Sequence, residues 1–174
     1  MDIVIASEAG GVIIHEAVGH GLEGDLQGSS VYAKQIGQKV AHEKVSIIDD
    51  PTLPGLRGFY RIDHEGNPAT KATLIENGIL KNYLQQESSA DFLTLPKTGH
   101  ARKQTYEYET IVRMGNTYMA PGQDKPADII ASVQDGLYVT SMGGGQVNTS
   151  SGDFVFKVQH ARRIRNGVLA EVVR

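Results

Sequence analysis

The sequence predicts an α+β fold, in which a curved, largely antiparallel sheet packs against a kinked helix and a few short helices. Two Asn-Gly pairs, Asn77-Gly78 and Asn166-Gly167, each separate runs of strand-forming residues and supply the positive φ angles of a tight hairpin turn. Segments with helical spacing are few and short, and 20 glycines among 174 residues indicate many turns. Because tryptophan is absent and phenylalanine scarce, Ile, Val and Leu must supply most of the core.

The N-terminal half begins with helical signals and then changes to strands. Helical spacing follows Gly10-Gly11 and returns after a glycine-rich stretch at 21–30, which we expect to be a loop. From Lys44 onward, β-branched residues are bounded by turn residues such as Asp50-Pro51. The predicted elements of this half are helices at 12–21 and 31–41 and strands at 45–49, 58–63, 72–76 and 79–83.

The C-terminal half combines two short helices with longer strands. Pro126 suits the first turn of a helix. His160 continues an alternating apolar face with Phe154, so we expect a buried core histidine rather than a ligand. The stretch 95–122 is long and irregular, as functional loops often are. The predicted elements are helices at 87–93 and 126–133 and strands at 137–141, from 154 toward the turn at 166, and at 168–173.

Length and composition limit the class of protein. A chain of 174 residues with 40% apolar and 21% charged residues is one globular domain of ordinary size, which we expect to span 1–174. The net charge of −3 and the pI near 6.1 give no reason to expect nucleic acid or an anionic membrane as partner. No apolar run reaches the roughly 18 residues of a membrane span. The lack of cysteine fits a reducing, cytoplasmic location and excludes a cysteine nucleophile.

One short motif has the composition of a metal site. His15 and His20 flank Glu16 in the run His15-Glu16-Ala17-Val18-Gly19-His20. A catalytic zinc takes about three protein ligands and keeps a position for water, and a nearby carboxylate accepts a proton from that water. The motif therefore predicts zinc ligands at His15 and His20 and a general base at Glu16. The alternative is that the motif arises by chance, with Glu16 as a surface carboxylate of a helix and His20 as a capping side chain.

The spacing of the two histidines requires an irregular helix. On a regular α-helix, residues at i and i+5 differ in direction by roughly 140°, so His15 and His20 would point away from each other. A π-bulge or kink returns them to one side, and such bulges often occur at functional sites. Gly19 is the residue best able to absorb the distortion. This segment is the kinked, metal-binding helix of the predicted fold.

Other polar residues offer weaker signals. Glu23 and Asp25 follow His20 closely and are candidates to orient a histidine through its second ring nitrogen, with solvation in a loop as the alternative. His100 lies in the irregular stretch, where a surface position is more common than a place in a substrate channel. The glycine run at 143–145 lacks the spacing of a phosphate-binding loop and indicates close backbone approach, for example to a peptide.

Several longer runs resemble the TldD half of the TldD/PmbA family, once called modulators of DNA gyrase. The similarity begins with the run 11–25, which contains the His-Glu motif, and continues in the same order through most of the chain. The other similar runs are 36–41, 74–80, 113–119, 143–149 and 151–156. Several ordered matches are more specific than a single metal motif.

The resemblance implies a zinc metallopeptidase that acts on unfolded or flexible peptides, with His15 and His20 as zinc ligands and Glu16 as catalytic base. It implies a homodimer, or a heterodimer with a PmbA-type (TldE) subunit. Family members carry a third zinc ligand, a cysteine near their C-terminus, and an N-terminal domain before the motif. This chain contains neither, so we expect it to be the core of a C-terminal metallopeptidase domain, truncated at both ends, and to bind zinc weakly.

The chief alternative is a non-catalytic peptide-binding subunit or scaffold of a TldD/PmbA-type complex. The intact His-Glu-x-x-x-His motif argues against it, since the inert partners lack that motif. The missing third ligand argues for it.

Overall fold

The computed structural model describes residues 1–26 and 28–173. Gln27, in the predicted loop at 21–30, and Arg174, at the end of the predicted domain, lie outside the described residues. The helical segments are α1 (Ser7–Ile13), η1 (Ile14–Gly19), η2 (His20–Leu22), η3 (Gly24–Leu26), α2 (Glu87–Leu93) and α3 (Pro126–Ala131). The strands are β1 (Asp2–Ile5), β2 (Ile47–Asp49), β3 (Ala72–Glu76), β4 (Ile79–Leu80), β5 (Ala101–Arg102), β6 (Ile111–Val112), β7 (Thr117–Met119), β8 (Asp135–Val147), β9 (Phe154–Arg165) and β10 (Val168–Val173).

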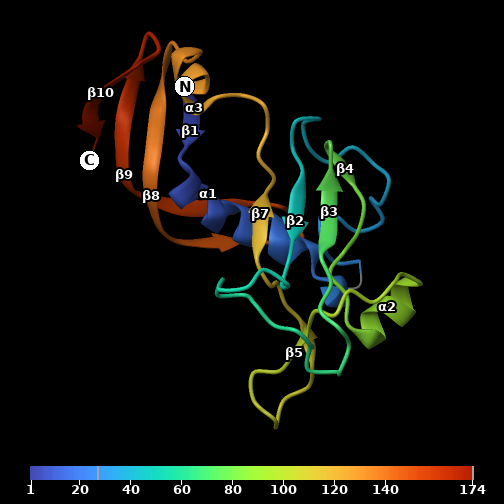
Figure 1. Cartoon of the computed structure of the whole chain (residues 1–174). Helices are drawn as coiled ribbons and strands as arrows, with labels where there is room; N and C mark the ends of the chain where they lie inside the picture. Colours follow the sequence, from blue (N-terminus) through green and yellow to red (C-terminus); the bar gives the residue numbers. More distant parts are fainter. Residues whose placement is uncertain (27, 174) are drawn as a thin grey trace.

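The strands form three separate sheets, with the first helix between the two larger ones (Figure 1). One sheet has the order β1-β8-β9-β10, and only its β1–β8 pair is parallel. The second has the order β4-β3-β2-β7 and is antiparallel throughout, while β5 and β6 form a small hairpin sheet. The predicted α+β class with mostly antiparallel strands is confirmed, and the strands are divided among three sheets.

Both Asn-Gly turns have the predicted conformation. Asn77 and Gly78 have φ angles of 48° and 78°, and Asn166 and Gly167 have 48° and 77°. These pairs of positive values are those of a type I′ turn, whose twist matches that of the strands it joins. The two turns connect β3 to β4 and β9 to β10.

The main core lies between the β4-β3-β2-β7 sheet and the π-helical segment η1. Leu22, Leu74, Leu80 and Leu84 are fully buried there, and the partly buried Ile14 packs against this cluster. The apolar side of the irregular helix is thus fixed on a sheet. Its histidines are left on a different side.

Two predicted elements are wrong, because their backbone groups find other partners. The stretch 31–41 is a series of turns with positive φ at Lys34 and Gly37. Its backbone N–H groups at Gly37 and Val40 donate to carbonyls of the β3–β4 hairpin instead of to a helix. The stretch 58–63 has a single isolated bridge, from Ile62, because Gly58 and Tyr60 bond to loop atoms.

The other predictions differ from the structure mainly at their ends. Helix α2 has the predicted bounds, and α3 begins at Pro126 as expected but ends at Ala131. Strand β8 continues beyond Ser141 through the glycine run, where the ring of Phe156 lies over Gly145. None of the helices in the described part of the chain has the length and apolar character needed to cross a membrane.

Candidate metal centre

The helix that carries the motif changes its winding between the two histidines. After α1 ends, η1 continues as a π-helix, and the backbone N–H of His20 donates to the carbonyl of His15. This bond spans five residues instead of the four of an α-helix, so the turn is wider. The wider turn places His20 above His15 on one side. The predicted irregular helix is confirmed.

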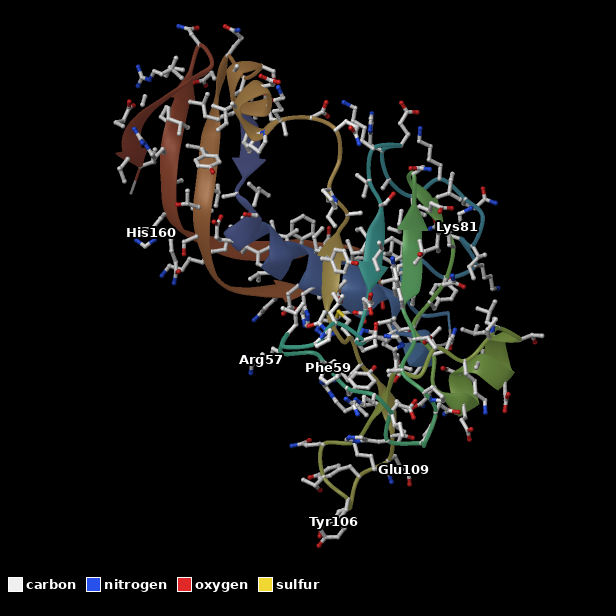
Figure 2. The ribbon with its side chains drawn as sticks, viewed as in Figure 1. Arg57, Phe59, Lys81, Tyr106, Glu109 and His160 are labelled. Atoms are coloured by element: carbon white, nitrogen blue, oxygen red, sulfur yellow. The ribbon has the colours of Figure 1, made fainter. Side chains whose placement is uncertain are left out.

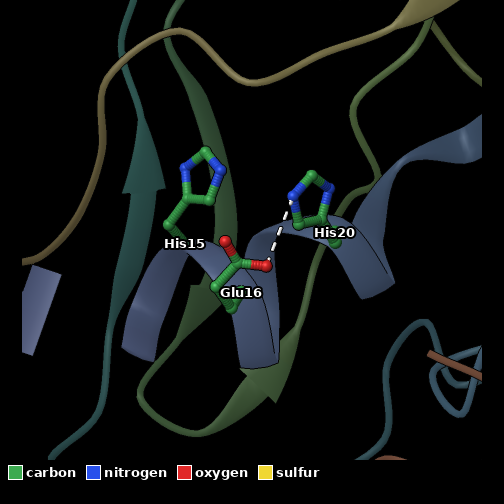
Figure 3. A group of neighbouring side chains, drawn as sticks. All are labelled: His15, Glu16 and His20. Atoms are coloured by element: carbon green, nitrogen blue, oxygen red, sulfur yellow. Dashed lines mark ion pairs between the residues drawn. The ribbon is translucent and has the colours of Figure 1, made fainter. Parts of the chain in front are cut away.

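The two imidazoles and Glu16 form a compact cluster (Figure 3). The ring centroids of His15 and His20 are 4.9 Å apart and the rings are nearly perpendicular, at 87°. One ligand atom from each of the three side chains lies within 4.8 Å of the others, and the Glu16 Oε2 to His20 Nε2 distance is 3.6 Å. Spacing of this kind lets two nitrogens and a carboxylate oxygen face one small ion.

Gly19 has a different role from the one predicted for it. Its φ and ψ are −57° and −52°, which any residue adopts in a helix, so the distortion does not depend on glycine flexibility. Instead, a Cβ at this position would lie 2.0 Å from the sulfur of Met114. The missing side chain lets the buried Met114 pack directly against the helix backbone beside His20.

Glu23 orients His20, as the sequence suggested. Its Oε2 lies 3.1 Å from His20 Nδ1 and 3.0 Å from an Nη1 donor of Arg113, and the side chain is only 6% exposed. The backbone N–H of Leu84 donates to the carbonyl of Leu22, and the Leu84 carbonyl accepts from the N–H of Gly24. This isolated bridge to Leu84 fixes the backbone of Glu23. A carboxylate that accepts the Nδ1 proton leaves the His20 Nε2 lone pair available for a metal.

Asp25, the other candidate for this role, binds elsewhere. Its Oδ2 accepts a hydrogen bond from the backbone N–H of Val112 at 2.9 Å. This bond anchors the backbone directly before Arg113. Burial raises the pKa of Asp25 above its ordinary value. Asp25 therefore supports the wall of the site and does not contact a histidine.

The surroundings shift the pKa values of the two histidines in opposite directions. Burial lowers the pKa of His15, and the neighbouring His20 lowers it further. The hydrogen bond to Glu23 raises the pKa of His20 by more than burial lowers it. His15 thus favours the neutral form that a metal ligand requires, while Glu23 keeps a proton on the far nitrogen of His20.

An open cleft of about 1050 Å³ lies in front of the histidines. Its other walls are the loop after β2 and the segment from Arg113 to Tyr118 that leads into β7. The loop contributes Leu53, Leu56, Arg57 and Gly58. Arg102 of β5 also lines the cleft. A cleft of this size is large enough to bind a ligand.

A buried aspartate holds one wall of the cleft in place. Asp49 is fully buried and accepts hydrogen bonds from the Gly115 N–H, the Thr117 hydroxyl and His100 Nε2. His100 is 1% exposed, and its other ring nitrogen faces Thr98, so the expectation of a surface histidine is wrong. Sequence reasoning missed this pair because only the folded chain brings residues 51 positions apart together.

His160 is also placed differently from its prediction. The alternating pattern of β9 suggested a buried face, but His160 is exposed on β9, and Figure 2 shows it at the edge of the molecule. Among the described residues, the cluster of His15, Glu16 and His20 is the group that could hold a metal ion. The sequence contains two other His-Glu pairs, His42-Glu43 and His64-Glu65, and neither is part of such a group.

A helix that presents clustered His, Glu and His side chains, set between two mostly antiparallel sheets, defines an α+β domain with a candidate metal centre. Comparison with known proteins gives the family. The model of the PmbA/TldA metallopeptidase C-terminal domain matches residues 1–174. The chain belongs to this family, and the resemblance noted in the sequence is confirmed.

Relatives along the whole chain are named as metalloproteases. A "Metalloprotease TldD homolog" from Buchnera aphidicola subsp. Acyrthosiphon pisum is 45% identical over 174 residues, which are 99% of this chain and 36% of that protein. A "Zinc metalloprotease TldD homolog" from Saccharolobus solfataricus is 32% identical over 99% of this chain and 39% of its own length. The chain thus spans less than two fifths of these relatives.

Solved structures confirm the fold. TldE from Thermococcus kodakarensis superimposes with a TM-score of 0.84 at 22% identity, covering 98% of this chain and 39% of that one. A putative modulator of a DNA gyrase from Thermotoga maritima gives a TM-score of 0.85, also at 22% identity and with the same coverage. At such identities the likeness concerns the fold alone.

Proposed function

We propose that this chain forms the metal-binding core of a zinc-dependent peptidase. The observation that carries the proposal is the π-helical turn, which brings His15 and His20 to one side with Glu16 between them (Figure 3). Without that turn, the same three residues would not face a common ion. The metalloprotease names of the relatives support the same class of protein.

The donor set fits zinc. Two imidazole nitrogens are typical ligands for this ion, and the carboxylate of Glu23 on the far side of His20 is the usual arrangement behind a zinc-bound histidine. His15 and His20 would hold the ion. The chain contains no cysteine, so the third protein ligand implied by the family resemblance is not among its residues.

Glu16 is the proposed general base. When bound, zinc supplies Lewis acidity, which lowers the pKa of water and polarises a carbonyl group. The Glu16 carboxylate, 29% exposed beside His20, accepts the proton of the attacking water and delivers it to the leaving amine nitrogen. Glu23 and Arg113 keep the His20 ring fixed during this transfer.

The remaining features of the proposal concern the whole protein. We propose that residues 1–174 act as one domain, the core of a C-terminal metallopeptidase domain. Its substrates are unfolded or flexible peptides, which the open cleft admits. It works in the cytoplasm as a homodimer or with a PmbA/TldE-type subunit, a pairing that membership of the PmbA/TldA family supports.

The test measures zinc and turnover separately. Zinc affinity is determined by competition with a chromophoric chelator, in this chain and in the product of the full reading frame that contains it. Replacing His15 or His20 by Ala should lower the affinity by about 10-fold or more, whereas His160→Ala, on the exposed face of β9, should leave it unchanged. Glu16→Gln should keep zinc and reduce peptide turnover by about 10²–10⁴-fold.

Two outcomes would contradict the proposal. Turnover that survives Glu16→Gln would show that Glu16 is not the general base. Zinc-free protein that binds peptides with full affinity would instead identify a non-catalytic peptide-binding subunit.

A further inference from the structure

The cleft is cationic, although the chain as a whole is acidic. Three arginines line it, Arg57, Arg102 and Arg113, whereas the full chain has 20 acidic against 17 basic residues. Glu16 stands beside the histidines, and no Asp or Glu is among the described residues that line the rest of the cleft. Such a concentration of one sign of charge in a concave surface favours a ligand of the opposite sign.

Two of these arginines have charges that the protein does not neutralise. Arg113 forms an ion pair with Glu23, the carboxylate that orients His20. Arg57 and Arg102 are exposed and form no ion pair with another residue in the described part of the chain. Their guanidinium groups are therefore free to bind an anionic group that enters the cleft.

Both arginines are carried by well-anchored backbone. Gly58, next to Arg57, donates its N–H to the Asn116 side chain, and a Cβ on Gly58 would lie 2.1 Å from the Gly115 carbonyl oxygen. The loop that presents Arg57, shown at its edge in Figure 2, is thus pinned to the opposite wall of the cleft. Arg102 is held in β5 by its pairing with Ile111 of β6.

We propose that Arg57 and Arg102 determine substrate specificity by binding a carboxylate of the peptide that occupies the cleft. The proposal rests on the proposed peptidase function for the nature of the ligand. The guanidinium group suits a carboxylate because its parallel N–H donors match the two oxygens. Two kinds of peptide provide this chemistry, one with an acidic side chain and one with a free C-terminal carboxylate.

The experiment measures binding, which does not require turnover. Dye-labelled eight-residue peptides of Ala, Ser and Gly are titrated with zinc-free protein, and the Kd is obtained from fluorescence anisotropy. One peptide carries a central Glu and an amidated C-terminus, a second carries Gln and a free C-terminus, and a third carries Gln and an amidated C-terminus. At low ionic strength, at least one of the first two should bind more tightly than the neutral third, and comparing them identifies the source of the carboxylate.

Charge-removing variants locate the effect. Arg57→Gln and Arg102→Gln should each weaken binding of the preferred peptide by roughly three- to fivefold and leave the neutral peptide unaffected. Arg57→Lys should restore part of the preference because it keeps the charge. Arg61→Gln is the matched control, since Arg61 is exposed four residues from Arg57 but does not line the cleft.

The proposal is overturned if the neutral peptide binds as tightly as both acidic ones, or if Arg61→Gln weakens binding as much as Arg57→Gln. A carboxylate preference in a protein without turnover would uphold this inference and reject the peptidase. Turnover without any preference for a carboxylate would reject this inference and uphold the peptidase.

Discussion

The two four-stranded sheets differ in how deeply their side chains are buried. In the β4-β3-β2-β7 sheet, Leu74 and Leu80 are fully buried and Asp49 makes three hydrogen bonds without contact to solvent. In the β1-β8-β9-β10 sheet, the buried cluster is small, and Val155 and Val172 are 75% and 66% exposed. The helix that carries the candidate metal ligands packs on the main core, beside the densely packed sheet, through Ile14 and Val18. Apolar packing of this helix on the main core and the buried Glu23 beside His20 hold the geometry of the candidate site.

The largest expected effect concerns two aspartates, one from each sheet. Asp49→Ala should reduce the free energy of unfolding by about 3–5 kcal/mol, because it leaves buried His100 without its charged partner. Asp135→Ala removes an exposed ion pair with Arg163 and should cost only about 0–1 kcal/mol. Urea unfolding followed by circular dichroism measures both. Equal losses would mean that the two sheets hold their polar groups equally firmly.

A second test uses apolar side chains. Leu74→Ala creates a cavity in the main core and should reduce the free energy of unfolding by about 2–5 kcal/mol. Val172→Ala, on exposed β10, should change it by less than about 0.5 kcal/mol. The same urea titrations apply. A large loss at Val172 would show that its face is covered in solution, which would weaken the contrast between the sheets.

A third test compares two glycines of the same helical run. Gly19→Ala pushes a methyl group into Met114 and should cost about 1–3 kcal/mol while weakening zinc binding, because His20 follows directly. Gly11→Ala meets nothing within 4 Å and should stabilise the chain by about 0.5–1 kcal/mol through helix propensity. Unfolding and chelator competition are measured together. If both variants behave alike, contact with Met114 is not what requires glycine at position 19.

Local signals in the sequence predicted much of the fold. The Asn-Gly turns, the bounds of α2 and the start of α3 at Pro126 depend on neighbouring residues, and all agree with the structure. The irregular winding at His15 to His20 was also predictable, since two candidate ligands five positions apart require it to face one ion. The prediction of a helix at 31–41 was wrong, because backbone N–H groups of this stretch donate to carbonyls of the β3–β4 hairpin instead of to carbonyls within a helix.

The support of the candidate site was less predictable than its motif. Glu23 was a candidate because it lies three residues from His20, but its partner Arg113 is 90 positions away. The pairing of Asp49 with His100 gave no signal in the sequence, and the role of Gly19 depends on Met114 from a distant segment. A linear pattern indicates which residues are candidate metal ligands. The residues that hold them in place become visible only when the sheets bring distant segments together.

The smallest expected effect concerns Asp25, which anchors the wall segment at Val112. Burial raises the pKa of its carboxyl in the folded chain, so the folded state binds this proton more tightly than the unfolded state does. The charged form is therefore destabilising, and that penalty is absent at low pH and develops as the pH rises through the raised folded pKa. Asp25→Asn should consequently gain stability relative to the parent chain between about pH 4 and pH 7, as measured by urea unfolding across this range.

Asp91→Asn, an exposed position on α2, controls for the change in net charge. If the advantage of Asp25→Asn shrinks as the pH rises, the Val112 hydrogen bond stabilises the carboxylate more than burial opposes it, and Asp25 is a source of stability at neutral pH.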